Sequence, residues 1–150
     1  MSRILGLDIG DRKIGVALSD PSQVLASPLS TIVRYQDAKA INQIAALVKK
    51  YSATKIVIGL PYSLSGAIGK QAEKVLGFKQ QIAEAVNVEI IMQDERLSSV
   101  SANQKLREAG KKGSKLKNEM DAAAATVILQ SFLDEMKTNG DSEEPDKASH

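Results

Sequence analysis

Hydrophobic residues along this chain form two patterns, short continuous apolar runs and apolar positions at helical spacing. The continuous runs predict strands at residues 3–9, 14–19, 29–34, 55–61 and 88–92. The helical spacing predicts helices at residues 41–51, 70–86, 98–109 and 119–136. Pro21 and Pro28 are expected to bracket a loop between the second and third strands.

Three successive strands followed by alternating helices and strands predict an α/β fold. We expect a mixed five-stranded sheet whose first three strands are antiparallel, with helices on both faces. Residues 1–137 are predicted to form a single domain, and residues 138–150, polar and acidic, are predicted to be a disordered tail. In sheets of this kind, functional side chains gather at the carboxyl ends of the strands.

Three acidic residues fall at the boundaries of predicted elements. Asp8 interrupts the apolar first strand, Glu95 follows the fifth strand and Asp121 begins an alanine-rich helix. Each has a purely structural explanation: bonding of Asp8 to turn amides, pairing of Glu95 with Arg96, or a favourable helix dipole at Asp121. Together they predict a divalent-metal site, because gathered carboxylates repel one another unless a cation neutralises them. Oxygen ligands suit Mg²⁺ or Mn²⁺.

Such a site supports phosphodiester hydrolysis without histidine or cysteine. Two metal ions about 4 Å apart can activate a water and stabilise the leaving oxygen of an in-line displacement. The chain has no cysteine, and its one histidine is the last residue, His150. This composition argues against serine–histidine and cysteine nucleophiles and against zinc sites built from those side chains.

The net charge of +2 is unevenly distributed. Residues 134–150 hold six acids and two lysines, a balance of −4, which leaves +6 for residues 1–133. A basic body favours a polyanion as partner, although ordinary solubility charge is the alternative. The scarcity of aromatic residues, 3%, argues against a stacking platform for single strands and favours structured nucleic acid held by its backbone. The predicted nucleic-acid-binding residues are Arg12, Lys13, Arg96, Lys111, Lys112, Lys115 and Lys117.

No apolar run approaches the ~20 residues that span a bilayer. We therefore expect no membrane partner and a cytoplasmic location.

Four sequence blocks together resemble the YqgF (RuvX) family. They are residues 7–20 (LDIGDRKIGVALSD), 58–61 (IGLP), 94–98 (DERLS) and Asp121 with its following alanines. The resemblance covers residues 3 to about 135. It implies a ribonuclease H-like fold, similarity to RuvC-type Holliday junction resolvases, and metal-dependent cleavage in 5′-end maturation of pre-16S ribosomal RNA. By position, Asp8, Glu95 and Asp121 match the acidic site residues of the family.

Three segments depart from the patterns of the family and its relatives. Asp11 stands where other members carry Thr, and residues 62–66 (YSLSG) replace a more usual Leu-Asn-Met-Asp-Gly. RuvC-type resolvases also place an acid at the end of the fourth strand, where this chain has residues 59–61 (GLP).

The leading hypothesis is a metal-dependent endonuclease that acts on structured RNA in ribosome biogenesis. A Holliday junction resolvase is the first alternative, and it favours a homodimer because symmetric nicking needs two sites; a monomer also fits the sequence. A non-catalytic ribosome-assembly factor is the second alternative. A sugar-kinase or actin-like ATPase is the third, because Asp8-Ile9-Gly10 before a hairpin also occurs there, but 150 residues supply only one of the two domains needed.

Overall fold

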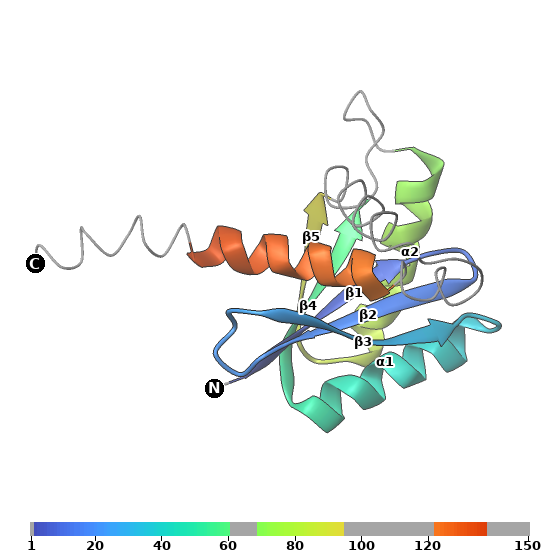
Figure 1. Cartoon of the computed structure of the whole chain (residues 1–150). Helices are drawn as coiled ribbons and strands as arrows, with labels where there is room; N and C mark the ends of the chain where they lie inside the picture. The colour runs from blue at the N-terminus through green and yellow to red at the C-terminus, as the bar shows by residue number, and fades with distance from the viewer. Residues whose placement is uncertain (1, 61–68, 95–121, 138–150) are drawn as a thin grey trace, which may run out of the picture.

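The computed structural model describes residues 2–60, 69–94 and 122–137, and its centre is a five-stranded sheet in the order β3-β2-β1-β4-β5 (Figure 1). The strands are β1 (Arg3–Ile9), β2 (Lys13–Ser19), β3 (Ala26–Val33), β4 (Ala53–Leu60) and β5 (Glu89–Asp94). β2 pairs antiparallel with β1 and β3, whereas β4 pairs parallel with β1 and β5. The predicted mixed sheet with three antiparallel leading strands is confirmed.

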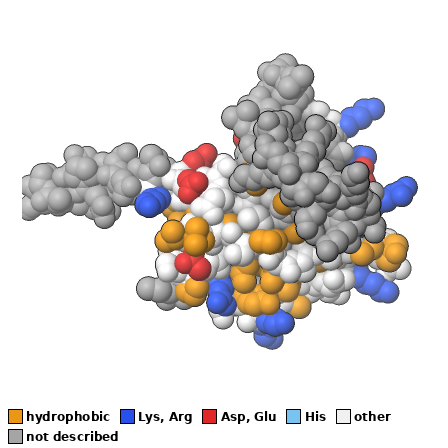
Figure 2. Space-filling model, viewed as in Figure 1, with side chains coloured by type: hydrophobic (Ala, Val, Ile, Leu, Met, Phe, Trp, Pro, Cys, Tyr) orange, Lys and Arg blue, Asp and Glu red, His pale blue; other side chains and the backbone are white. Residues whose placement is uncertain are grey.

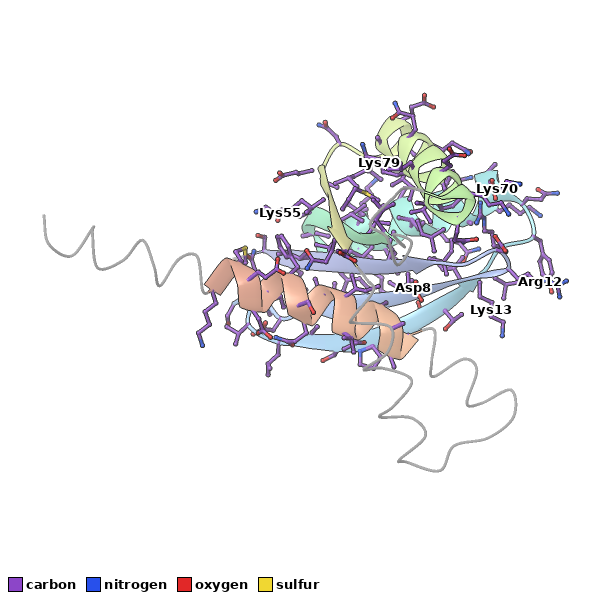
Figure 3. The ribbon with its side chains drawn as sticks, turned by 90° about the horizontal axis from the view of Figure 1, so that it is seen from above. Asp8, Arg12, Lys13, Lys55, Lys70 and Lys79 are labelled. Carbon is purple, nitrogen blue, oxygen red and sulfur yellow. The ribbon has the colours of Figure 1, made fainter. Side chains whose placement is uncertain are left out.

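Helices cover both faces of this sheet (Figures 1 and 3). α1 (Asp37–Tyr51) and α2 (Lys70–Ala85) lie on one face, and a helix over residues 122–137 lies on the other. Each face has its own hydrophobic core. Ile44 of α1 and Phe78 of α2 pack in the first core, while Ile128 and Leu129 pack in the second.

The central strand β1 is buried on both faces, which explains its continuous apolar sequence. Successive side chains of a strand point to opposite faces. Leu5 and Leu7 therefore enter the core beneath α1 and α2, whereas Ile4 packs in the core beneath helix 122–137. Asp8 shares the parity of Ile4 and so belongs to the face that helix 122–137 covers.

Gly6 lets helix 122–137 approach β1 closely. A Cβ atom at Gly6 would lie 2.7 Å from Leu129 Cβ and 3.1 Å from the Ala125 carbonyl oxygen. Real side-chain atoms do not tolerate such contacts, so any larger residue must displace the helix. The position of the helix relative to β1 thus depends on this glycine.

The predicted loop between Pro21 and Pro28 is wrong at its second boundary. β3 begins at Ala26 and contains Pro28, which lies opposite Ala17. β3 is an edge strand, where a residue without a backbone N–H is tolerated, and the register shifts between Val16 and Ala17. Edge position and irregular register are properties of the sheet, which a local pattern does not show.

The other predicted elements within the described residues are confirmed, with small differences at their ends. α1 begins at Asp37, four residues before the first apolar position of its stripe. The predicted helix at 98–109 and the predicted tail at 138–150 lie outside the described residues. Within the described ranges, no helix is long and apolar enough to cross a membrane.

Candidate active site

Asp8 is the penultimate residue of β1 and is half-buried. On one side it pairs with Gly15 of β2. On the other side lies Gly59 of β4, because Gly59 follows Ile58, the partner of Leu7. The two residues level with Asp8 on the adjacent strands are therefore both glycines, which have no side chain.

The end of β5 lies at the same edge of the sheet as Asp8. Gly59 pairs with Gln93, so Asp8, Gly59 and Gln93 occupy one level and one face. With strands about 4.8 Å apart, the Cα atoms of Asp8 and Gln93 are about 10 Å apart. β5 ends at Asp94, and the predicted ligand Glu95 is the next residue in the chain, outside the described part.

The beginning of helix 122–137 also lies near Asp8, as Figure 3 shows. Gly6 contacts the helix at Ala125 and Leu129. Asp8 is two residues further along β1, about 6.6 Å, which corresponds to about four residues of helix. Its level on the strand therefore matches the first turn of this helix. Asp121 precedes the first described residue of this helix, Ala122, in the sequence and is likewise outside the described residues.

A hydrogen bond also joins helix 122–137 to β5. Gln93 Nε2 donates to Glu135 Oε1 at 3.1 Å. Glu135 is thirteen residues beyond Ala122, so this bond attaches β5 near the C-terminal end of the helix and not near its start.

Of the predicted metal ligands, only Asp8 belongs to the described part of the chain. Over that part, no group of three or more His, Cys, Asp or Glu residues could hold a metal ion. Asp8 itself fits such a role, because a half-buried carboxylate is an oxygen donor that a divalent cation stabilises. The assignment of Glu95 and Asp121 as ligands stays a prediction.

A tight turn follows Asp8 and connects β1 to β2. The Gly10 N–H donates to the Lys13 carbonyl oxygen at 2.9 Å. A Cβ atom at Gly10 would lie 2.8 Å from that same oxygen, which explains the glycine. The turn presents Arg12, which is exposed, and Lys13, which is half-buried.

Arg34, directly after β3, holds this turn in place and was missed by sequence reasoning. Its Nη1 donates to the Gly10 carbonyl oxygen at 2.8 Å, and its backbone N–H donates to the Arg12 carbonyl oxygen at 2.8 Å. Its Nε donates to Asp37 Oδ1 at 2.8 Å, and the guanidinium carbon lies 4.3 Å from the centre of the Phe78 ring. An arginine at the end of an apolar strand was the only signal in the sequence.

Basic side chains surround this end of the molecule. Arg12 and Lys13 lie at the same end as Asp8, and Lys70 at the start of α2 is close to that end (Figure 3). Figure 2 shows Lys and Arg side chains along the edge that carries the β1–β2 turn and α2. The remaining predicted nucleic-acid-binding residues lie outside the described part: Arg96, Lys111, Lys112, Lys115 and Lys117.

Sequence comparison is decisive for the family. The family model "RuvX: Holliday junction resolvase" matches residues 2–135. The chain belongs to the RuvX family. A RuvX relative from Dehalococcoides mccartyi is 50% identical over 127 residues, covering 85% of this chain and 94% of the relative. Another, from Clostridium botulinum, is 47% identical over 134 residues, covering 89% and 98%. Both carry the name "Putative pre-16S rRNA nuclease".

The fold of this RuvX chain is similar to that of solved RuvC-like resolvases, the ribonuclease H-like fold. Thermus thermophilus RuvC in complex with a Holliday junction superposes with a TM-score of 0.52 and 14% identity, covering 91% of this chain and 96% of RuvC. The fowlpox virus resolvase in complex with Holliday junction DNA superposes with a TM-score of 0.53 and 13% identity, covering 89% of this chain and 98% of the resolvase. At these identities the likeness concerns the fold. The predicted fold class is confirmed.

Proposed function

We propose that this chain is a metal-dependent endonuclease that hydrolyses phosphodiester bonds in structured RNA, and that it processes the 5′ end of pre-16S ribosomal RNA. One observation supports the proposal: Asp8 lies at the edge of the sheet where β5 also ends, and its level on β1 matches the first turn of helix 122–137. Further acidic residues can therefore approach the Asp8 carboxylate from the end of β5 and from the start of this helix. Maturation of ribosomal RNA implies a cytoplasmic location.

In the proposed mechanism, Asp8, Glu95 and Asp121 hold Mg²⁺ or Mn²⁺. When bound, the metal supplies a Lewis acid and lowers the pKa of water for attack on phosphorus. The chain's own contribution is to hold Asp8 in the sheet between Gly15 and Gly59, two residues without side chains.

Basic residues bind the phosphate backbone in this proposal. Arg12 and Lys13 project from the turn that follows Asp8, and Arg96 and the lysines of residues 111–117 add charge in the sequence next to Glu95 and Asp121. Contacts to phosphate position a nucleic acid without reading its sequence. Substrate choice then depends on the shape of the RNA.

RNA is favoured over a DNA junction because the relatives at 47–50% identity are named for pre-16S ribosomal RNA. The Holliday junction remains the second candidate, supported by the description of the family model. Cleavage of a four-way junction would call for a homodimer, whereas RNA end processing is also possible for a monomer.

The test is cleavage of a labelled pre-16S RNA fragment and of a DNA four-way junction, with Mg²⁺, with Mn²⁺ and with a chelator. Asp8→Asn is expected to lower the cleavage rate at least about 100-fold while leaving thermal unfolding nearly unchanged, because a lost metal ligand removes several kcal/mol of transition-state stabilisation. Glu84→Gln, which removes one exposed carboxylate from α2, is the matched control. Full activity in Asp8→Asn would refute the metal-nuclease mechanism. Binding without cleavage by the wild type would favour the assembly-factor alternative.

A further inference from the structure

The aromatic ring of Tyr35 is exposed to solvent at the end of the sheet that carries Asp8. It lies two residues after the end of β3 and is 91% exposed, the highest value among the exposed large hydrophobic residues of the described part. Exposed apolar residues are common, but a nearly fully exposed aromatic ring beside basic side chains is a typical element of nucleic-acid-binding surfaces. The low aromatic content of the sequence, 3%, had favoured binding by the backbone over stacking on single strands.

A hollow of about 450 Å³ adjoins the ring. It lies between Tyr35, the β1–β2 turn at Asp11, and the α2 residues Lys74, Gly77 and Gln81. A Cβ atom at Gly77 would meet nothing within 4 Å, so this position leaves open space on the surface of α2. The volume falls in the range of small-ligand pockets, roughly 300–1,000 Å³.

The charges at the floor of the hollow are already paired. The Arg34 guanidinium bonds to Gly10 and Asp37 and lies over the buried Phe78 ring. Arg34 is therefore a structural element here, and the negative charge of Asp37 is compensated. The remaining functional groups at the surface are the Tyr35 ring, the Gln81 amide, the Lys74 amine and the Asp11 carboxylate.

Lys74 is available for an anion. Its amine is 3.9 Å from Asp11 Oδ1, at the limit of an ion pair, and the side chains of both residues are more than 60% exposed. Such pairs contribute little and exchange readily with other partners. Arg12, next to Asp11 on the turn, and Lys70, one helical turn before Lys74 on α2, are also exposed and add two positive charges near the Lys74–Asp11 pair.

The distance to Asp8 suits a single substrate strand. Asp8 pairs with Gly15, and Gly15 pairs with Thr31 of β3, which runs in the same direction as β1. Tyr35 lies four residues beyond Thr31, in the bend that leads from β3 into α1, so it is beyond the Asp8 end of the sheet and about 10 Å across it. The hollow lies on the face covered by α1 and α2 and Asp8 on the opposite face, so the substrate strand must pass around this edge of the sheet. A nucleic-acid strand whose phosphate lies at Asp8 can reach Tyr35 within a few nucleotides.

We propose that Tyr35 and the adjoining hollow bind an unpaired base a few nucleotides from the cleaved phosphodiester. The ring stacks on the base, Gln81 faces its edge, and Lys74 contacts the phosphate. This inference rests on the proposed nuclease function and specifies its substrate class: a duplex RNA that carries a single-stranded extension.

The experiment measures binding in the Asp8→Asn background, so that cleavage is not needed for the readout. The probes are an RNA hairpin with a single-stranded extension containing 2-aminopurine, whose fluorescence is quenched by stacking, and the same hairpin with a blunt end. Tyr35→Ala is expected to weaken binding of the extended hairpin about 10-fold and to abolish the quenching, with no change for the blunt hairpin. Tyr35→Phe, which keeps the ring, should behave as the parent protein.

Leu25→Ala is the matched control. Leu25 is 63% exposed and precedes β3, at the opposite end of the sheet from Tyr35. This variant loses an exposed apolar side chain and should bind both hairpins normally. Unchanged quenching and affinity in Tyr35→Ala would overturn the inference, as would an equal loss for both hairpins. If the wild type cleaves RNA and Tyr35→Ala binds normally, only this inference fails; if no RNA is cleaved, the nuclease proposal fails.

Discussion

The Nη1 atom of Arg34 donates a hydrogen bond to the carbonyl oxygen of Gly10 at 2.8 Å. Gly10 lies two residues after Asp8, in the turn that determines where β1 ends. The same guanidinium bonds to Asp37 at the start of α1 and lies over Phe78 of α2. One side chain thus connects the turn at the candidate active site to both helices on the opposite face of the sheet.

Replacing Arg34 should reduce catalysis more than binding. Arg34→Ala removes the bonds to Gly10 and Asp37, which should lower the free energy of unfolding by about 2 kcal/mol. A small displacement of the turn should also lower kcat about 10-fold or more, while the Kd for uncleaved RNA changes little. Arg34→Lys keeps the charge but not the planar fork and should recover only part of kcat.

The measurements are denaturant unfolding and single-turnover cleavage well below the melting temperature. Lys39→Ala, which removes an exposed cation from α1, is the control. An unchanged kcat in a destabilised Arg34→Ala protein would show that Arg34 acts on stability alone.

Gly6→Ala should destabilise the fold, because the new Cβ atom would lie 2.7 Å from Leu129 Cβ. Overpacking of this kind costs about 1–3 kcal/mol, measured as a shift of the urea midpoint. Gly77→Ala is the matched control: its Cβ atom meets nothing within 4 Å, and alanine is the better helix former by up to about 1 kcal/mol. The two substitutions should therefore shift stability in opposite directions. A neutral Gly6→Ala would mean that helix 122–137 moves away without cost.

Ser19→Ala should leave a buried donor without its partner. Ser19 is 1% exposed, and its Oγ accepts a hydrogen bond from the Ile4 backbone N–H at 2.8 Å. Leaving that N–H unsatisfied costs about 1–3 kcal/mol in unfolding free energy. Ser27→Ala, on the exposed surface of β3, should be nearly neutral. Because Ser19 lies at the end of the sheet away from Asp8, cleavage at low temperature should be unaffected; a large kcat loss would contradict this separation.

Asp20 should make folding stability depend on acid pH. The backbone N–H groups of Leu25 and Val24 donate to its carboxylate and hold its pKa below the ordinary value of 3.8. A lowered pKa in the folded state stabilises the fold above pH 3.8 and loses that contribution as pH falls from 3.8 through the folded value. Asp20→Asn should therefore flatten the dependence of unfolding free energy on pH in that acid range. An identical slope in both proteins would rule out this linkage.

The sequence alone determined the elements and their order. Apolar runs and helical stripes are local patterns, so the five strands, α1, α2 and the last helix could be located from short windows. Acidic residues at element boundaries pointed to one edge of the sheet, because the carboxyl ends of parallel strands share an edge. Asp8 lies at that edge, as expected.

Tertiary structure decided what depends on partners distant in the chain. Pro28 is tolerated inside β3 because the strand is at an edge, Arg34 acts through a turn 24 residues earlier, and Gly6 matters because Leu129 packs on it. The sequence contains few aromatic residues, but only the fold shows that the Tyr35 ring is exposed to solvent at the Asp8 end of the sheet. Each of these properties arises from packing between segments that are distant in the sequence. A local run of residues does not determine such packing.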